Sequence, residues 1–413
     1  MSVPFARRTN WDLTINRYTQ ALEEHRSTGK ELLDLTASNP TTIGLHYNQE
    51  RLLRALSKPG ALTYEPMPKG LLAAREAIAE YYAECEVRIS PEDLILTTST
   101  SEAYSFIFRL LCDPGDAVLV PTPSYPLFDF LADLQDVKLA QYELVYDHGW
   151  QMDFHSVEQT LSQNSRSSEF HGSEAPSGRC RAILVVHPNN PTGSFVKQQE
   201  AGRLSRLCAA KGLAIVSDEV FLDYSLTEGP TAASFASGFD SKNGTQALTF
   251  TLSGLSKISG LPQMKVAWIA VTGPEEQKRE ALGRLEVIAD TYLSMNAPLQ
   301  QAIPEMLAER HDIQRQLISR IRINLALLDQ QLAAQKVCAR LVVEGGWYVI
   351  LRVPATVGDE ELAIAILRQT GVLVQPGHFY DFATDGCLVV SLITPEEIFA
   401  EGINRLLRFL AEA

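Results

Sequence analysis

The apolar positions in the central part of the chain gather in short, β-branched runs that end in polar turns. Such runs predict buried strands at residues 94–98, 182–186 and 213–218, and a further strand that begins at Thr249. Amphipathic segments at residues 101–112 and 197–211 predict helices between these strands. The alternation favours an α/β fold, with a large domain of about residues 55–290 whose mostly parallel sheet is flanked by helices.

The two ends of the chain have mixed patterns and predict a smaller α+β domain built from both. The predicted elements are a helix at 15–27, a strand at 31–40, a long helix at 299–335, strands at 342–353, 371–380 and 387–393, and a helix at 395–411. Residues 1–54 are expected to form an arm and part of the small domain, and residues 291–413 the rest of it. The Ser- and Gly-rich stretch at residues 162–179, which contains His171, predicts an exposed loop or a partly disordered insertion, without chemistry.

Length and composition narrow the class of protein. A chain of 413 residues exceeds one hydrophobic core, which indicates two domains. The formal net charge of −14 argues against non-specific binding to nucleic acid or to an anionic membrane. The 6 cysteines form no CxxC pair, so we expect free thiols in a reducing cytoplasm and no metal site. The N-terminus has no signal-peptide pattern, and no run approaches the ~18 apolar residues of a membrane span.

Two residues stand where buried strands end in polar segments. Lys257 lies in a Gly-rich turn between Ser256 and Ser259, and Asp218 ends the strand at 213–218. A lysine in this place is either a solvated loop residue or a desolvated amine held for Schiff-base chemistry. An aspartate there is either a helix-capping residue or a functional carboxylate, because α/β folds place ligands at the carboxyl ends of their strands.

Several segments decide between these alternatives: TSTSEAY (98–104), PNNPTG (188–193), SDEV (217–220) and TFTLSGLSKISGLPQMK (249–265). In this order and spacing they resemble the class I/II aminotransferases, pyridoxal-phosphate enzymes of the aspartate aminotransferase fold (fold type I). The resemblance covers the chain from about Leu33 to its C-terminus. It implies a transaminase with pyridoxal 5'-phosphate as cofactor, a small-molecule amino donor, a 2-oxo acid acceptor, and a homodimer with shared active sites.

The resemblance also implies the catalytic roles. Lys257 binds the cofactor covalently, and after its release it acts as general base and acid at the substrate carbon. Asp218 pairs with the pyridine nitrogen and keeps it protonated, so that the ring draws electrons from the substrate. Asn190 hydrogen-bonds the phenolic oxygen, and Tyr125 stacks on the ring.

Other residues are expected at the phosphate and the substrate. The phosphate is assigned to Ser99, Thr100, Ser101, Ser256, Lys265 and Tyr64 of the neighbouring subunit. At the start of a helix, free N–H groups and the positive dipole end favour a phosphate, although Ser and Thr there also serve as N-caps. Weaker candidates for the substrate pocket are Ser38, Asn39, Gly346, Trp347, Tyr348, His378 and Tyr380.

The chain departs from the family pattern at three positions. Phe221 replaces a tyrosine that donates to the phenolic oxygen, and Lys265 replaces a phosphate-binding arginine. Val389 stands where the family has the arginine that clamps the substrate carboxylate, and Arg352 and His378 are the only substitutes we can suggest. These departures leave the substrate open, between an amino acid bound by another cation and an amine, an amino alcohol or a modified amino acid.

Alternatives to transamination remain at this point. The same carbanion chemistry also serves lyases, racemases, decarboxylases and oxidases. Aminotransferase-like domains also act as effector sensors in transcription regulators, but only about 50 residues precede the large domain here, without a helix-turn-helix pattern or a basic cluster.

Overall fold

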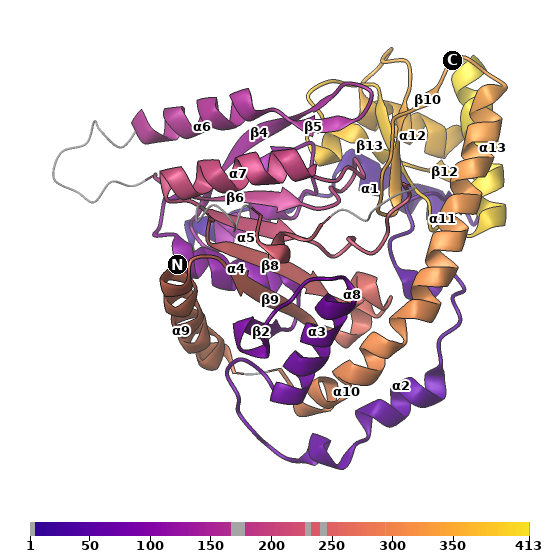
Figure 1. The fold of residues 1–413 in the computed structure, drawn as a ribbon. Helices are drawn as coiled ribbons and strands as arrows, with labels where there is room; N and C mark the ends of the chain where they lie inside the picture. Colours follow the sequence, from indigo (N-terminus) through magenta and orange to yellow (C-terminus); the bar gives the residue numbers. More distant parts are fainter. Residues whose placement is uncertain (1–4, 167–177, 228–232, 240–245, 294, 413) are drawn as a thin grey trace, which may run out of the picture.

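The computed structural model describes residues 5–166, 178–227, 233–239, 246–293 and 295–412. Most of the predicted loop at 162–179, including His171, therefore lies outside the described residues. Within them the α/β prediction is confirmed, with one large sheet and a smaller α+β part (Figure 1). The domain limits at residues 54 and 290 stay predictions.

The large sheet has 8 strands in the order β2-β9-β8-β7-β6-β3-β4-β5. Their bounds are β2 (Leu94–Thr97), β3 (Ala117–Thr122), β4 (Lys138–Tyr146), β5 (Trp150–Met152), β6 (Cys180–Val186), β7 (Ala214–Asp218), β8 (Thr249–Gly254) and β9 (Ala267–Thr272). The neighbours from β4 through β3, β6 and β7 to β8 pair in parallel, whereas β9 runs antiparallel to both β8 and β2. Because the carboxyl ends of β6, β7 and β8 meet at one edge, the segments that follow them come together in space.

Helices cover both faces of this sheet (Figure 1). On one face lie α4 (Thr100–Leu111), α5 (Phe128–Leu134) and α9 (Glu275–Tyr292). On the other lie α2 (Gln49–Leu56), α3 (Leu72–Glu84), α6 (Phe154–Arg166), α7 (Gln198–Lys211) and α10 (Ala297–Ala308). The near-continuous apolar runs of the central strands follow from this double coverage, since both sides of each strand are buried.

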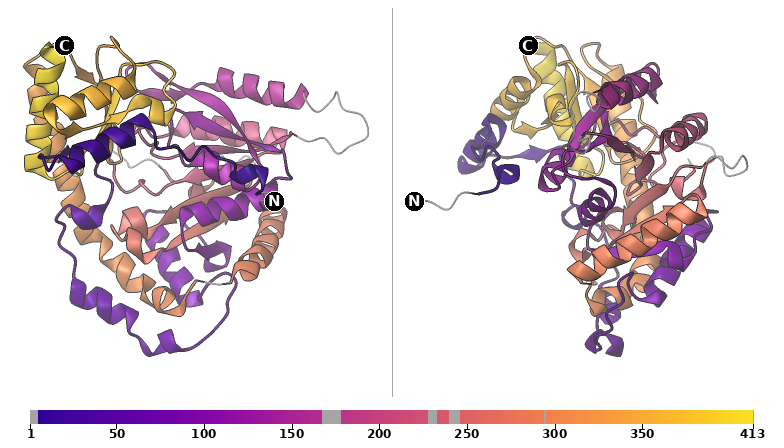
Figure 2. Two further views of the ribbon diagram at one scale, coloured as in Figure 1. Left: turned by 180° about the vertical axis from the view of Figure 1, so that it is seen from behind. Right: turned by 90° about the vertical axis from the view of Figure 1, so that its left-hand side faces the viewer.

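The smaller part joins the two ends of the chain. Its antiparallel sheet has the order β10-β11-β14-β13, with β10 (Ala339–Arg340), β11 (Tyr348–Arg352), β13 (Gln375–Pro376) and β14 (Cys387–Ser391). A separate parallel pair links β1 (Leu33–Asp34) to β12 (Val372–Leu373). Figure 2 shows the N-terminal helix α1 (Arg17–Ser27) beside the C-terminal elements, where it packs on α12 (Asp359–Thr370). This arrangement confirms that both chain ends build the small domain.

The long helix expected at 299–335 is wrong as a single element. It is divided at Glu309 into α10 and α11 (Arg310–Ala333). The two pieces have different partners, because α10 packs on α2 and α3 whereas α11 packs on α13 (Glu396–Glu412). The apolar period continues across the joint because each helix buries one face, so the pattern alone does not mark the change of direction.

Candidate active site

A cavity of about 360 Å³ lies at the carboxyl ends of β6, β7 and β8. Val186 and Asp218 end β6 and β7, and Lys257 follows β8 in the single-turn helix α8 (Leu255–Ile258). The cavity is lined by many of the residues expected at the site: Ser38, Thr100, Ser101, Tyr125, Asn190, Asp218, Phe221, Ser256 and Lys257. Segments more than two hundred residues apart in sequence, from Ser38 to Lys257, therefore meet in one place.

The amine of Lys257 lies over the rings of Trp347 and Phe221. The Nζ atom lies 4.4 Å from the centroid of the Trp347 ring and 5.2 Å from that of Phe221. Burial lowers the pKa of the amine to about 8, although the negative charge of Asp218 acts in the opposite direction. The backbone is held in place by Tyr224, whose O–H donates to the Lys257 carbonyl oxygen at 2.7 Å. A lysine with this pKa is partly uncharged near neutral pH and can act as a nucleophile.

Asp218 is the acidic group of the cavity. The hydroxyl of Tyr104 donates to Asp218 Oδ2 at 2.9 Å, and the backbone N–H of Val220 donates to Oδ1 at 3.2 Å. Burial raises the pKa of Asp218, while these hydrogen bonds and the charge of Lys257 lower it. A buried carboxylate in this position is suited to hold a protonated ring nitrogen, because such a cation would supply the missing charge partner.

Asn190 lies in the loop after β6, and its side-chain Oδ1 is buried without a hydrogen-bond partner among the described residues. Buried polar atoms are nearly always hydrogen-bonded, so the unpaired Oδ1 of a residue that lines the cavity is an exception that a bound ligand would remove. The amide can donate or accept, because the oxygen and nitrogen of an asparagine are assigned from their partners. The residue therefore fits the phenolic oxygen of pyridoxal phosphate.

The start of α4 forms the opposite wall. The Ser99 hydroxyl accepts the backbone N–H of Glu102 at 3.1 Å, so this serine is the N-cap of the helix and does not line the cavity. The next residues, Thr100 and Ser101, line the cavity together with Ser256. Hydroxyl groups and a helix N-terminus suit a phosphate. With Lys257, Asp218 and Asn190, the donor set fits pyridoxal phosphate.

Other expected residues lie away from the cavity. Asn39 is exposed, and its Oδ1 accepts the backbone N–H of Thr41 at 3.0 Å. Lys265 is exposed after β8, with a positive φ of 50°. His378 is exposed in a 3-10 helix, and Tyr64 is 77% exposed beside Asn296. Trp347 is fully buried behind the lysine rather than on the cavity wall. The roles suggested for these residues remain predictions.

Sequence reasoning missed part of the lining. Tyr104 is the last residue of the motif TSTSEAY. It lies four residues after Thr100 and thus on the same face of α4, which the motif alone does not indicate. Gln375 gave one signal, as a polar residue between Val374 and Pro376 in an apolar run. The remaining unpredicted lining residues are apolar: Leu127, Phe128, Val186 and Val220.

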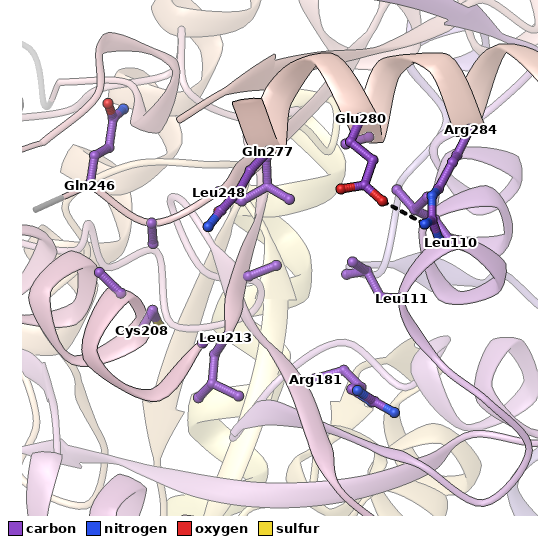
Figure 3. Close-up of a pocket in the computed structure, with 15 residues that line it drawn as sticks. Leu110, Leu111, Arg181, Cys208, Leu213, Gln246, Leu248, Gln277, Glu280 and Arg284 are labelled. Carbon is purple, nitrogen blue, oxygen red and sulfur yellow. Dashed lines mark hydrogen bonds and ion pairs between the residues drawn. The ribbon is translucent and has the colours of Figure 1, made fainter. Parts of the chain in front are cut away.

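A second cavity, of about 330 Å³, lies at the amino ends of β6 and β7 (Figure 3). Its charged residues are paired, with Arg284 bonded to Glu280 and Arg181 Nε 2.6 Å from Asp116 Oδ2. No residue expected at the site lines it. In the part of the chain that the structure describes, no three His, Cys, Asp or Glu side chains form a group that could hold a metal, and no helix has the length and apolar character of a membrane span.

Comparison with known proteins places this geometry in a family. The family profile for aminotransferases of class I and II matches residues 12–406. Glutamate-pyruvate aminotransferase AlaA of Haemophilus influenzae is 26% identical, over 96% of this chain and 94% of its own. An alanine aminotransferase of Mycobacterium bovis is also 26% identical, over 92% of this chain and 86% of its own.

Solved structures agree on the fold. The alanine aminotransferase of Pyrococcus furiosus has a TM-score of 0.84 at 22% identity, covering 99% of this chain and 100% of its own. An aspartate aminotransferase of Thermotoga maritima has a TM-score of 0.79 at 20% identity, covering 98% and 100%. At these identities the structures support the fold and not a substrate.

Proposed function

Because the chain belongs to the class I and II aminotransferase family and is an aminotransferase, we propose that it carries pyridoxal phosphate on Lys257 and moves an amino group from a small amine or amino acid to a 2-oxo acid. The observation that carries the proposal is one cavity holding a lysine whose pKa is lowered to about 8 and a buried carboxylate, Asp218. These are the groups that the chemistry requires at the two ends of the cofactor ring.

Pyridoxal phosphate supplies an electron sink that allows a proton to leave the carbon bearing the amino group. Lys257 would hold the cofactor covalently, and its lowered pKa suits it to take up and return that proton. Asp218 would hold the ring nitrogen protonated. Tyr104 and the N–H of Val220 fix the orientation of this carboxylate through their hydrogen bonds.

The remaining residues orient the ring and exclude water. Asn190 would hydrogen-bond the phenolic oxygen through its amide, and Tyr125 would offer an aromatic face. Thr100, Ser101 and Ser256 would hold the phosphate together with the N-terminus of α4. Trp347 and Phe221 pack against the lysine amine and contribute to the burial that lowers its pKa.

We further propose a homodimer in which Tyr64 reaches the phosphate of the neighbouring subunit. The support is its 77% exposure in a Pro- and Gly-rich segment, since a tyrosine so exposed is available to a second copy. The 6 unpaired cysteines favour a reducing compartment, which makes the cytoplasm the proposed location.

The test mixes the protein, purified with pyridoxal phosphate, with pools of amino donors and follows the cofactor spectrum. The first pool contains alanine and glutamate, because the relatives are named for alanine and for glutamate and pyruvate. Transamination leaves the cofactor in its pyridoxamine form, and a 2-oxo acid restores it. Release of ammonia with an unchanged cofactor would instead indicate a lyase.

A further inference from the structure

The small sheet forms one wall of the active-site cavity. Gln375 in β13 pairs with Val389 in β14, and Val389 pairs with Ile350 in β11. Residues directly opposite in antiparallel strands share a face, and Tyr348 shares it too because it lies two residues from Ile350. Since Gln375 and Tyr348 line the cavity, this face of the sheet is turned towards it.

The part of this face that lines the cavity carries no positive charge. Lys257 is the only Lys, Arg or His among the residues that line the cavity in the described chain, and it is engaged in the proposed chemistry. Arg352 and His378, the two cations that the sequence suggested, are exposed and do not line the cavity. A substrate group that contacts this wall therefore meets only neutral side chains from its own subunit.

Gln375 is held by a neighbouring tyrosine. The Tyr380 hydroxyl donates to Gln375 Oε1, and no hydrogen bond found among the described residues uses Gln375 Nε2. Burial raises the pKa of Tyr380 well above its ordinary value and raises that of Tyr348 as well, so both remain O–H donors at working pH. The wall thus offers the Nε2–H groups of Gln375 and a tyrosine hydroxyl, all uncharged.

We propose that Gln375, positioned by Tyr380, selects an amino donor whose end next to the small sheet is an uncharged hydrogen-bond acceptor, a hydroxyl or a carboxamide, in place of a carboxylate. This inference rests on the proposed transaminase function and names its substrate class. The apolar residues Leu127 and Phe128 on the cavity lining add a preference for a donor with an apolar or aromatic body.

The physical reason is the cost of removing a charge from water. A carboxylate buried against neutral donors loses its hydration without gaining a charge partner, whereas a hydroxyl or carboxamide oxygen needs only one donated hydrogen bond. Because no cation on this wall offsets the lost hydration, the cost of burial falls on the carboxylate and not on the neutral acceptors. Gln375 supplies the donor that the neutral acceptor needs.

The test compares matched donors in the half-reaction, which needs no acceptor. Enzyme loaded with pyridoxal phosphate is mixed separately with L-phenylalanine, L-phenylalaninol and L-phenylalaninamide, and the rate of conversion to the pyridoxamine form is measured against donor concentration. We expect phenylalaninol or phenylalaninamide to have a kcat/KM at least about tenfold above that of phenylalanine.

A higher kcat/KM for phenylalanine would overturn the inference while leaving transamination intact. Failure of alanine, glutamate and all three of these donors would overturn the proposed function itself.

Two variants of opposite charge test the role of Gln375. It lies on an edge strand and is only partly buried, so substitutions there disturb the core little. Gln375→Arg should move the preference towards phenylalanine by at least about tenfold, and Gln375→Glu, which keeps the size of the side chain, should move it further away. A purely structural role would change both donors alike and leave their ratio constant, which would contradict the assignment.

A neutral substitution covers the case in which Gln375→Arg does not fold. Gln375→Met keeps the length of the side chain and removes its N–H donors, so it should lower the kcat/KM of phenylalaninol relative to that of phenylalanine. If a folded Gln375→Arg or Gln375→Met variant leaves this ratio at the wild-type value, Gln375 does not face the substrate.

Discussion

The two cavities at opposite ends of the large sheet are nearly equal in volume, about 360 Å³ and 330 Å³, but differ in the state of their polar groups. At the amino ends of the strands, Arg284 is paired with Glu280 (Figure 3), and Arg181 is paired with Asp116. At the carboxyl ends, Lys257 has a lowered pKa and Asn190 has a buried atom without a partner. Volume therefore does not distinguish the two cavities, whereas unmet charge and hydrogen-bonding needs do.

The difference has a physical origin in the fold. Each parallel strand of the large sheet delivers a polar loop to its carboxyl end, and the loops after β6, β7 and β8 converge on one cavity. The converging groups are buried before a ligand satisfies them, which costs stability and prepares binding. At the amino ends, the exposed pair of Arg284 and Glu280 contributes little, as is typical of surface ion pairs, and the buried Asp116 already has Arg181 as its partner.

The largest effect should come from Lys257→Ala. Without this amine the protein cannot bind pyridoxal phosphate covalently, so borohydride reduction followed by peptide mapping should find no labelled peptide and activity should be lost. Arg284→Ala in the other cavity is the matched control and should keep activity within about twofold, since an exposed pair is worth little. Trapping of the cofactor at a different lysine would refute the assignment of Lys257.

Asp218→Asn should reduce kcat by about a hundredfold or more. The amide keeps the size of the side chain but cannot hold the ring nitrogen protonated, and removal of one preorganised electrostatic group costs roughly 10²–10³ in rate. Glu280→Gln in the other cavity is the comparison variant, expected to have near-wild-type kcat. Equal effects of the two substitutions would erase the distinction between the cavities.

Lys257 also predicts a pH-dependent stability of the cofactor-free protein. Its pKa is about 8 in the folded chain against an ordinary value of 10.5, so between these pH values the unfolded chain binds more protons. Stability contributed by this group therefore rises as pH increases through that window, and below pH 8 its burial is fully unfavourable. Cofactor-free Lys257→Met should have a higher free energy of unfolding than wild type at pH 7. The difference between the two proteins should be smaller at pH 9.5, and urea unfolding at both pH values measures it. A difference in the free energy of unfolding that does not change with pH would contradict the lowered pKa of Lys257.

The smallest effect should come from Phe221→Tyr. The Phe221 ring lies 5.2 Å from Lys257 Nζ and lines the cavity, so a hydroxyl added there can donate towards the phenolic oxygen of the bound cofactor. Such a donor stabilises the deprotonated form and should lower the pKa of the cofactor's linkage to the lysine. A pH titration of the visible spectrum in both proteins measures the difference. An unchanged or raised pKa would mean that position 221 does not face that oxygen.

Much of the site was predictable because it is local in sequence. Asp218 ends a strand, and Lys257, Asn190 and Thr100 each follow the end of a strand by three or four residues. An apolar run followed by polar residues therefore marks each place in the sequence. The rule that parallel strands bring such turns to one edge then predicts their convergence. The large sheet was accessible for the same reason, since its strands are buried on both faces.

Other features depend on contacts between distant residues. The helix boundary at Glu309 follows from separate partners for α10 and α11, which the continuous apolar period does not reveal. The hydrogen bond from Tyr104 to Asp218 joins residues that are 114 positions apart. Lys265 and Asn39 match the expected motif positions in sequence but lie outside the cavity, because the direction of an exposed side chain is set by its local backbone and neighbours.

The sequence by itself determined the α/β class, the family and the strand ends that meet at the candidate site, because apolar periodicity and short motifs are properties of neighbouring residues. Only the tertiary structure decided what surrounds those residues. The register that sets Gln375 opposite Val389, and the burial that lowers the pKa of Lys257, arise from segments brought together by folding. Strand register and desolvation are set by long-range packing, which no local pattern records.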